Sequence, residues 1–203
     1  MGIERFPPFI REHYEVHEWK HACAILEADF PSEYADIIDV LTVFRVPASH
    51  IVVGGGGKTK IAQALDAEFI GKRGWIEKKF DTSVIVDGDE KKSPTHKVDC
   101  YKNKVALELE WNNKDPFFDR DLNNFRLLFD LRAISAGVII TRTDELQNVF
   151  DTLYDVKGKC IGPKYGNSTT HMSKLLPRIQ GGGGGGCPIL VFGIKKSLYV
   201  EDM

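Results

Sequence analysis

The chain has 203 residues, of which 42% are hydrophobic and 28% charged, and its formal net charge is −2 at pH 7. This length can bury one sizeable core, and the composition is that of an ordinary soluble globular protein. No apolar run reaches the roughly 18 residues of a membrane-spanning helix, and the N-terminus lacks the features of a secretory signal. We therefore expect a single domain over residues 1–203, located in the cytoplasm and without a membrane partner.

The four cysteines are widely scattered and form no CxxC pair; they are Cys23, Cys100, Cys160 and Cys187. A zinc site needs clustered ligands, and a cytoplasmic chain favours reduced thiols, so we expect free cysteines. The slightly negative net charge does not indicate nucleic-acid binding. It does not exclude it either, because DNA binding needs only a local basic surface and acidic metal ligands lower the total charge.

The first third of the chain has helical spacing of its apolar residues. This spacing predicts one helix over residues 14–30, a second that begins at Ser32 and runs through Leu41, and a third over residues 59–72. The stretch between the second and third helices gives no clear pattern.

Two glycine runs interrupt the chain. The first, residues 54–57, precedes Lys58, Thr59 and Lys60, but Val52 stands where a Walker A phosphate loop needs its leading glycine. Two interpretations stay open for this run: backbone and lysine contacts with a DNA phosphate, or a flexible loop with solvated lysines. The second run, residues 181–186, is either a close backbone approach to DNA or a partner subunit, or a flexible connector, which we favour.

The rest of the chain alternates between strand and helix patterns. Strands are predicted over 82–86, 96–101, 104–111, 136–141 and 188–194, and helices over 119–134, 144–153 and 172–179. This order predicts an α/β fold in which a central mixed β-sheet is flanked by helices.

Three carboxylates fall on the two strands that the short link Lys102-Asn103 joins. Asp99 stands near the end of the first strand, and Glu108 and Glu110 stand near the end of the second. Residues two apart on a strand project from the same face, so Glu108 and Glu110 lie side by side. A tight antiparallel turn would bring Asp99 within reach of both.

Converging carboxylates repel one another unless a cation neutralises them, and oxygen ligands select Mg²⁺. Such an ion can polarise a phosphoryl oxygen and lower the pKa of a bound water, which is the chemistry of phosphodiester hydrolysis. The alternative is that the alternating Glu and Leu residues give one solvated and one buried face. The aspartate at a strand end, the hairpin and the E-x-E pattern together favour the metal site.

The three acids follow the pattern D-x8-E-x-E, which resembles a variant of the PD-(D/E)xK nuclease motif. The chain more specifically resembles the BglII/BstYI group of type II restriction endonucleases, through residues 62–75, residues 102–111 and, more weakly, residues 188–194. The resemblance implies a PD-(D/E)xK core and a homodimer that uses Mg²⁺ to cut both strands of a short palindromic site. It also implies a cognate DNA methyltransferase as a functional partner in a prokaryotic cell.

Carried over residue by residue, the resemblance makes Asp99 and Glu108 direct metal ligands, together with the carbonyl group of Leu109. Glu110 stands where many relatives have lysine and the BglII/BstYI group has glutamine; glutamate there resembles BamHI. A carboxylate could position or deprotonate the attacking water, so the role of Glu110 and the number of metal ions stay open. Glu68, on the preceding helix, is a candidate accessory acid, with a solvated helix face as the alternative.

DNA contacts are expected from polar loops and from lysines beside them. The candidates for base contacts are Asn167, Ser168, Thr169, Thr170 and His171, although a helix-capping role for this loop is an alternative. The candidates for phosphate contacts are Lys58, Lys60, Lys164 and Lys174. The helix over 119–134 could form part of a dimer interface, or its apolar stripe could simply pack on the sheet.

Two other functions compete with the restriction endonuclease. One is another enzyme on the same nuclease core, such as a repair or modification-dependent nuclease, and the other is a non-catalytic DNA-binding module. A broken carboxylate set would indicate the non-catalytic module, and here the set is whole. The compact length, without a recognition or helicase domain, favours the restriction enzyme over the other nucleases.

Overall fold

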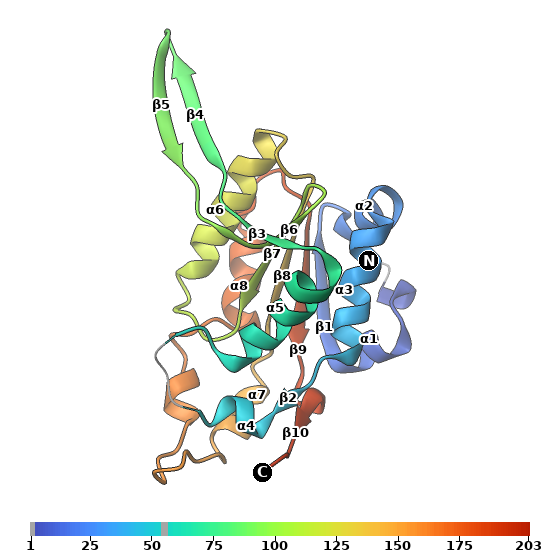
Figure 1. Cartoon of the computed structure of the whole chain (residues 1–203), viewed down its shortest axis with the longest axis vertical. Coiled ribbons are helices and arrows are strands. Elements are labelled where there is room, and N and C mark those ends of the chain that lie inside the picture. The colour runs from blue at the N-terminus through green and yellow to red at the C-terminus, as the bar shows by residue number, and fades with distance from the viewer. Residues whose placement is uncertain (1–2, 54–56) are drawn as a thin grey trace.

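The computed structural model describes residues 3–53 and 57–203. Within them, a central sheet has the strand order β1-β9-β8-β7-β6-β3. Its strands are β1 (Tyr14–Trp19), β3 (Ile76–Lys78), β6 (Val98–Lys102), β7 (Val105–Glu110), β8 (Ala136–Arg142) and β9 (Ile189–Ile194). β7, β8 and β9 are parallel, whereas β1, β6 and β3 are antiparallel to their neighbours. The predicted α/β fold with a central mixed sheet is confirmed (Figure 1).

Helices cover both faces of the sheet. One face packs against α1 (Pro8–His13), α2 (Ala22–Asp29), α3 (Pro31–Val43) and α5 (Lys60–Arg73), and the other packs against α6 (Phe117–Asp130) and α8 (Met172–Gln180). Other short elements are β2 (Val46–Pro47), α4 (Ala48–Ile51), α7 (Leu146–Phe150) and β10 (Tyr199–Val200). Among the described residues, no helix is both long enough and apolar enough to span a membrane.

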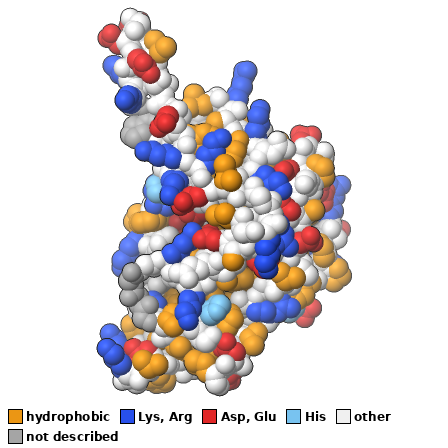
Figure 2. All heavy atoms as spheres, in the orientation of Figure 1, with side chains coloured by type: hydrophobic (Ala, Val, Ile, Leu, Met, Phe, Trp, Pro, Cys, Tyr) orange, Lys and Arg blue, Asp and Glu red, His pale blue; other side chains and the backbone are white. Residues whose placement is uncertain are grey.

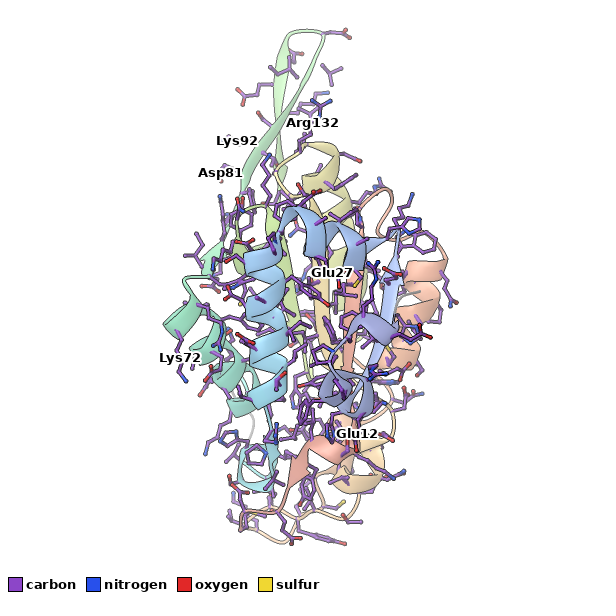
Figure 3. The ribbon with its side chains drawn as sticks, turned by 90° about the vertical axis from the view of Figure 1, so that its right-hand side faces the viewer. Glu12, Glu27, Lys72, Asp81, Lys92 and Arg132 are labelled. Atoms are coloured by element: carbon purple, nitrogen blue, oxygen red, sulfur yellow. The ribbon has the colours of Figure 1, made fainter. Side chains whose placement is uncertain are left out.

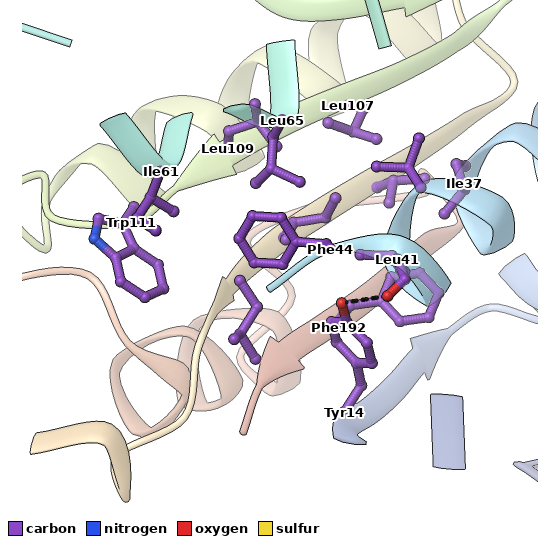
Figure 4. Close-up of a cluster of buried hydrophobic side chains, with 14 of the residues drawn as sticks. Tyr14, Ile37, Leu41, Phe44, Ile61, Leu65, Leu107, Leu109, Trp111 and Phe192 are labelled. Carbon is purple, nitrogen blue, oxygen red and sulfur yellow. Dashed lines mark hydrogen bonds between the residues drawn. The ribbon is translucent and has the colours of Figure 1, made fainter. Parts of the chain in front are cut away.

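Strand β7 directs its side chains alternately to the two faces. Leu107 and Leu109 point into the cluster shown in Figure 4, where Leu65 of α5 and Phe192 of β9 also lie. Ala106 packs on the opposite side, in the cluster formed with α6 and α8. Because side chains alternate along a strand, the even-numbered residues that follow Ala106 also project toward α6.

The close contact between β8 and α6 gives a stability prediction. A Cβ atom at Gly137 would lie 2.5 Å from the ring of Phe125, so Gly137→Ala should lower the free energy of unfolding by about 1–3 kcal/mol through overpacking. Gly71 in α5 is the matched control, because a Cβ atom added there would meet no other atom within 4 Å. At this position, alanine should raise the free energy of unfolding by about 0.5–1 kcal/mol. Urea unfolding measures both variants, and equal stabilities would contradict this packing.

The predicted helix over residues 14–30 is wrong in its first part. Residues Tyr14–Trp19 form the edge strand β1, which pairs with β9, and only Ala22–Asp29 are helical. Lys20 and His21 have φ values of 54° and 59°, and these left-handed residues make the turn between the two elements. The pairing with β9 overrides the local helical spacing.

The other predicted elements are confirmed with changed boundaries. The helix predicted over 144–153 is limited to α7, and the helices at 59–72 and 119–134 correspond to α5 and α6. The strand at 82–86 is β4 (Asp81–Val86), but it pairs only with β5 (Asp89–Pro94), which was not predicted. The two strands form a hairpin that projects from the body of the molecule (Figure 1).

The second glycine run is a close-packed connector. A Cβ atom at Gly183 would lie 2.9 Å from the carbonyl oxygen of Arg178, and one at Gly185 would lie 2.5 Å from the side chain of Arg126. The run therefore packs against α6 and α8, so the interpretation as a flexible connector is wrong. In the first run, positions 54–56 lie outside the described residues. The expected free cysteines are confirmed.

Candidate active site

Asp99 and Glu108 hold each other in place where strands β6 and β7 separate. Regular pairing between the two strands stops at Cys100. Beyond it, Oδ2 of Asp99 accepts a hydrogen bond from the backbone N–H of Leu109 at 3.0 Å, and the N–H of Asp99 donates to Oε2 of Glu108 at 3.2 Å. Because the N–H and C=O of an extended residue point to the same edge of a strand, the carbonyl group of Leu109 also faces Asp99.

Glu108 and Glu110 are buried, with relative exposures of 0% and 1%. The alternative in which they form a solvated strand face is therefore wrong. Burial raises the pKa of Glu108 well above its usual range, and the charges of Asp121 and Asp99 raise it further. Burial is also the largest cause that raises the pKa of Asp99. The carboxylates are thus placed where a negative charge is unfavourable without a neutralising cation.

Glu110 is held by residues that follow it and by helix α6. Its Oε2 accepts a hydrogen bond from the side-chain amide of Asn113 at 3.0 Å, and Nη2 of Arg120 lies 3.5 Å from its Oε1. The same Nη2 atom lies 2.8 Å from Oδ1 of Asp121, a fully buried residue of α6. Burial, followed by the charge of Asp121 and a hydrogen bond to it, raises the pKa of Glu110 to about 9.

The sequence-based interpretation missed Asp121. A signal was present, since Asp121 lies three residues after Phe118 and one before Leu122, on the apolar face of a helix that packs on the sheet. A carboxylate at such a position is buried, and buried carboxylates are rare unless they are paired or bind a cation.

Helix α5 brings a different acid toward Asp99 than the one predicted. Glu68 is paired with Lys72 and, at 2.8 Å, with Arg73, and Lys72 lies at the outer edge of the molecule (Figure 3). Asp66, by contrast, has a buried Oδ1 atom with no hydrogen-bond partner among the described residues, and its charge contributes to the raised pKa of Asp99 after burial. We therefore replace Glu68 by Asp66 as the candidate accessory acid.

A polar cleft of about 540 Å³ opens beside the end of β7. Its lining includes Asn112 and Asn113, which follow Glu110 closely in the chain, and three of the lysines singled out from the sequence. Those lysines are Lys58, Lys60 and Lys164. Segments that are a hundred residues apart in the chain thus contribute positive charge to one cleft next to the carboxylates.

A comparison with protein families shows to which family the chain belongs. The family described as restriction endonuclease BglII/BglIII matches residues 14–194, which include all the strands of the central sheet. The chain belongs to the BglII/BglIII restriction endonuclease family. It is a type II restriction endonuclease, a site-specific deoxyribonuclease that acts on phosphodiester bonds of double-stranded DNA. No curated protein matches the chain.

The endonuclease exposes only part of the loop that was predicted to contact bases. Asn167 and Ser168 are exposed, whereas Thr169, Thr170 and His171 are buried. The Thr169 hydroxyl group accepts a hydrogen bond from Arg142 at 2.9 Å, and Nδ1 of His171 lies 2.8 Å from Oδ1 of Asp144.

The prediction that Thr169, Thr170 and His171 contact bases is wrong for this structure, because their side chains are buried and not available to a base. Thr170 is wholly buried, and its backbone N–H donates to the carbonyl group of Asn113. The loop is therefore packed against the segment that follows β7, with Asn167 and Ser168 at its surface. Lys174 lies on α8, outside the residues that line the cleft.

The surface of the endonuclease carries mixed charge. On the face shown in Figure 2, basic and acidic side chains are interspersed. This distribution agrees with the net charge of −2 and leaves the lysine-lined cleft as a local basic feature.

Restriction endonuclease families typically use a divalent metal ion. In the described part of the chain, no group of three or more Asp, Glu, His or Cys side chains already converges as a metal site. The donor set nevertheless fits such an ion, because two buried carboxylate oxygens, Oε1 of Glu108 and Oδ1 of Asp66, have no hydrogen-bond partner among the described residues. Hard cations prefer oxygen ligands of this kind.

Proposed function

We propose that this endonuclease is a Mg²⁺-dependent homodimer that cuts both strands of a short palindromic site in duplex DNA. The observation that carries the proposal is the interlocked pair of Asp99 and Glu108, with an unpaired, buried oxygen of Glu108 beside a lysine-lined cleft. Buried carboxylates with this arrangement are unfavourable in a purely structural role, and they match the D-x8-E-x-E pattern of the nuclease motif.

In this proposal Asp99, Glu108 and the carbonyl group of Leu109 hold Mg²⁺, which when bound polarises the scissile phosphate and lowers the pKa of a bound water. Glu110 accepts a proton from the attacking water or orients it. Without a cation, its pKa of about 9 keeps Glu110 protonated at neutral pH; a bound divalent ion would favour the ionised form, which can accept a proton. Asn113 and Arg120 fix its orientation. Glu110 therefore acts on the attacking water in this proposal, and it has no role in protonating the leaving oxygen.

The cleft lysines, Lys58, Lys60 and Lys164, would contact phosphates beside the scissile bond. Lys58 forms an ion pair with Asp66 in the structure, and Lys164 donates a hydrogen bond to the carbonyl group of Val53. DNA phosphates would compete for both lysines. The exposed Asn167 and Ser168 are the proposed base contacts, since Asn side chains can bind adenine with two hydrogen bonds.

Two substitutions should separate base contacts from phosphate contacts. Asn167→Ala should reduce discrimination at one position of the recognition site by about 1–3 kcal/mol, because a base contact is lost. Lys60→Ala should weaken binding to all sequences alike and reduce the salt dependence of binding by about one phosphate contact. Binding titrations on a library of single-base variants at several salt concentrations measure both. An equal loss on every sequence for Asn167→Ala would contradict the base contact.

A homodimer is proposed because a palindromic site presents the same half-site twice. Each active site cuts one strand, so cutting both strands needs two copies of the chain. The companion of such an enzyme is a DNA methyltransferase that protects the same site, and the proposed location of both is the cytoplasm of a prokaryotic cell.

One experiment tests the proposed function directly. The protein is incubated with varied duplex DNA in the presence of Mg²⁺ or EDTA, and the cut ends are sequenced. Discrete fragments with a fixed, two-fold symmetric motif, seen with Mg²⁺ and abolished by EDTA, are expected. A non-specific ladder would instead indicate a different nuclease on this core, and no cleavage with any divalent ion would refute the proposal.

A further inference from the structure

A loop over residues 154–160 follows α7 and has a defined shape. An isolated β-bridge between Tyr154 and Cys160 closes its base. Toward its tip, the backbone N–H of Asp155 donates a hydrogen bond to the carbonyl oxygen of Lys159 at 2.9 Å. In Figure 1 this loop lies at the end of the molecule opposite the β4–β5 hairpin.

The tip of the 154–160 loop is positively charged. Between residues 154 and 164 the chain has three lysines and one aspartate. Lys157 and Lys159 are exposed. The aspartate, Asp155, bonds to the backbone of the turn: its Oδ1 accepts hydrogen bonds from the N–H groups of Lys157 and Lys159 at 2.8 and 2.9 Å. The only acid of the segment therefore holds the turn that presents both lysines to solvent.

A groove of about 420 Å³ joins this loop to the lysine-lined cleft beside the carboxylates. Lys159 and Cys160 line the groove, and Val53 and Lys164 line both the groove and the cleft. At this junction, the ammonium group of Lys164 donates to the carbonyl oxygen of Val53 at 3.1 Å. Positive charge thus continues from the cleft through Lys164 to the loop, in a chain whose net charge is −2.

Duplex DNA, the substrate of this family, has the chemistry that such a surface fits. Its phosphates form an unbroken line of negative charge, with one charge per about 1.7 Å of helix axis. A groove that leaves the carboxylates and stays positive can follow this line. Lysines on a fixed turn suit phosphate contacts, which position a protein on the duplex without reading its sequence.

We propose that the 154–160 loop binds the DNA backbone outside the recognition site, with Lys157 and Lys159 each contacting a phosphate. The contact lies beyond Lys164, on the path that leads away from the carboxylates. The inference rests on the proposed function, because it places DNA in the lysine-lined cleft. It extends that function by a flanking contact that strengthens binding to all sequences alike.

The salt dependence of DNA binding tests the two phosphate contacts. Wild type and the double variant Lys157→Gln, Lys159→Gln are titrated in EDTA with a long duplex of mixed sequence, and binding is followed by fluorescence anisotropy. From about 50 to 200 mM salt, the affinity of the variant should fall about tenfold less than that of wild type, because two phosphate contacts are lost. An unchanged salt dependence in this variant would overturn the inference.

The matched control removes two exposed lysines at the opposite end of the molecule. Lys91 and Lys92 lie on the β4–β5 hairpin, where Figure 3 labels Lys92. The double variant Lys91→Gln, Lys92→Gln should keep the salt dependence of wild type. An equal reduction in the control and the loop variant would show an effect of total charge and would also overturn the inference.

Asp155→Ala separates the shape of the turn from its charge. The substitution adds positive charge but removes the acceptor that holds the backbone at Lys157 and Lys159. If the turn positions both lysines on phosphates, the salt dependence should fall despite the added positive charge. An unchanged or larger salt dependence would contradict the contact by this turn.

Two further duplexes test where the contact lies. Both contain the motif found at the cut ends, but one continues well beyond the motif and the other ends at its edge. Wild type should bind the short duplex more weakly, whereas the loop variant should bind both more nearly alike. An equal loss on both duplexes would place the lysines within the site and refute the flanking contact. The mixed-sequence titration needs neither metal nor motif, so it decides the inference even if wild type cuts no DNA.

Discussion

Replacing Glu108 by alanine is expected to abolish DNA cleavage, with a loss of at least about 10³-fold, while DNA binding stays largely intact. A metal ion contributes several kcal/mol of stabilisation to the transition state, and each 1.36 kcal/mol corresponds to a tenfold change in rate. Glu108 carries both the bond to the Asp99 backbone and an unpaired buried oxygen, so its removal affects the ion and the local geometry together. Single-turnover cleavage and a gel-shift titration in EDTA measure the two properties separately.

Lost activity from Glu108→Ala would not come from unfolding, because the substitution removes a buried acid whose charge is unfavourable. Thermal unfolding of the variant in EDTA checks this point. Glu77→Ala is the matched control, since Glu77 is an exposed glutamate of β3 that pairs with Lys97. Its cleavage rate should equal that of wild type. A Glu108→Ala enzyme that cuts at the wild-type rate would refute the site assignment.

The hairpin that carries the proposed site could be predicted because its pairing is local. Strands β6 and β7 are joined at Asn103 and Lys104, whose φ values of 42° and 67° make a tight turn. The alternation of Leu and Glu along β7 then determines which side chains share a face. Strand β1 was missed for the opposite reason. Its partner β9 lies at the other end of the chain, so no local pattern contains the pairing that makes residues 14–19 extended.

The positions of single polar residues around the site depend on tertiary packing. The pattern of α6 predicted its apolar stripe, but only the approach of α6 to β7 shows that Asp121 is buried beside Glu110. Similarly, the polar loop that ends at His171 has the composition of a surface segment. Its packing against Arg142 and the segment after β7 buries Thr169 and Thr170. The composition of this segment predicted a loop, but only its tertiary packing shows which of its side chains are exposed and able to contact DNA.

In EDTA, the endonuclease is expected to lose stability as the pH rises from 7 to 9. The pKa of Glu110 is raised in the folded state to about 9, chiefly by burial, whereas the unfolded chain has a glutamate pKa of about 4.3. A raised folded-state pKa gives stability that is complete below the unfolded pKa and is lost as the pH rises through the folded pKa. The expected loss between pH 7 and pH 9 is about 2 kcal/mol, or roughly 4–8 °C in Tm.

The histidines act outside this pH window. Burial lowers the pKa of His96 and His171, and these residues act in the opposite sense, but only below about pH 6.5. Thermal unfolding at pH 7 and pH 9 should show the fall in Tm for wild type and a much smaller fall for Glu110→Gln. Added Mg²⁺ should also make the fall in the Tm of wild type between pH 7 and pH 9 smaller, because a bound cation favours the ionised carboxylates and binds only the folded chain. A fall in Tm of the same size in Glu110→Gln would show that this buried carboxyl group is not its source.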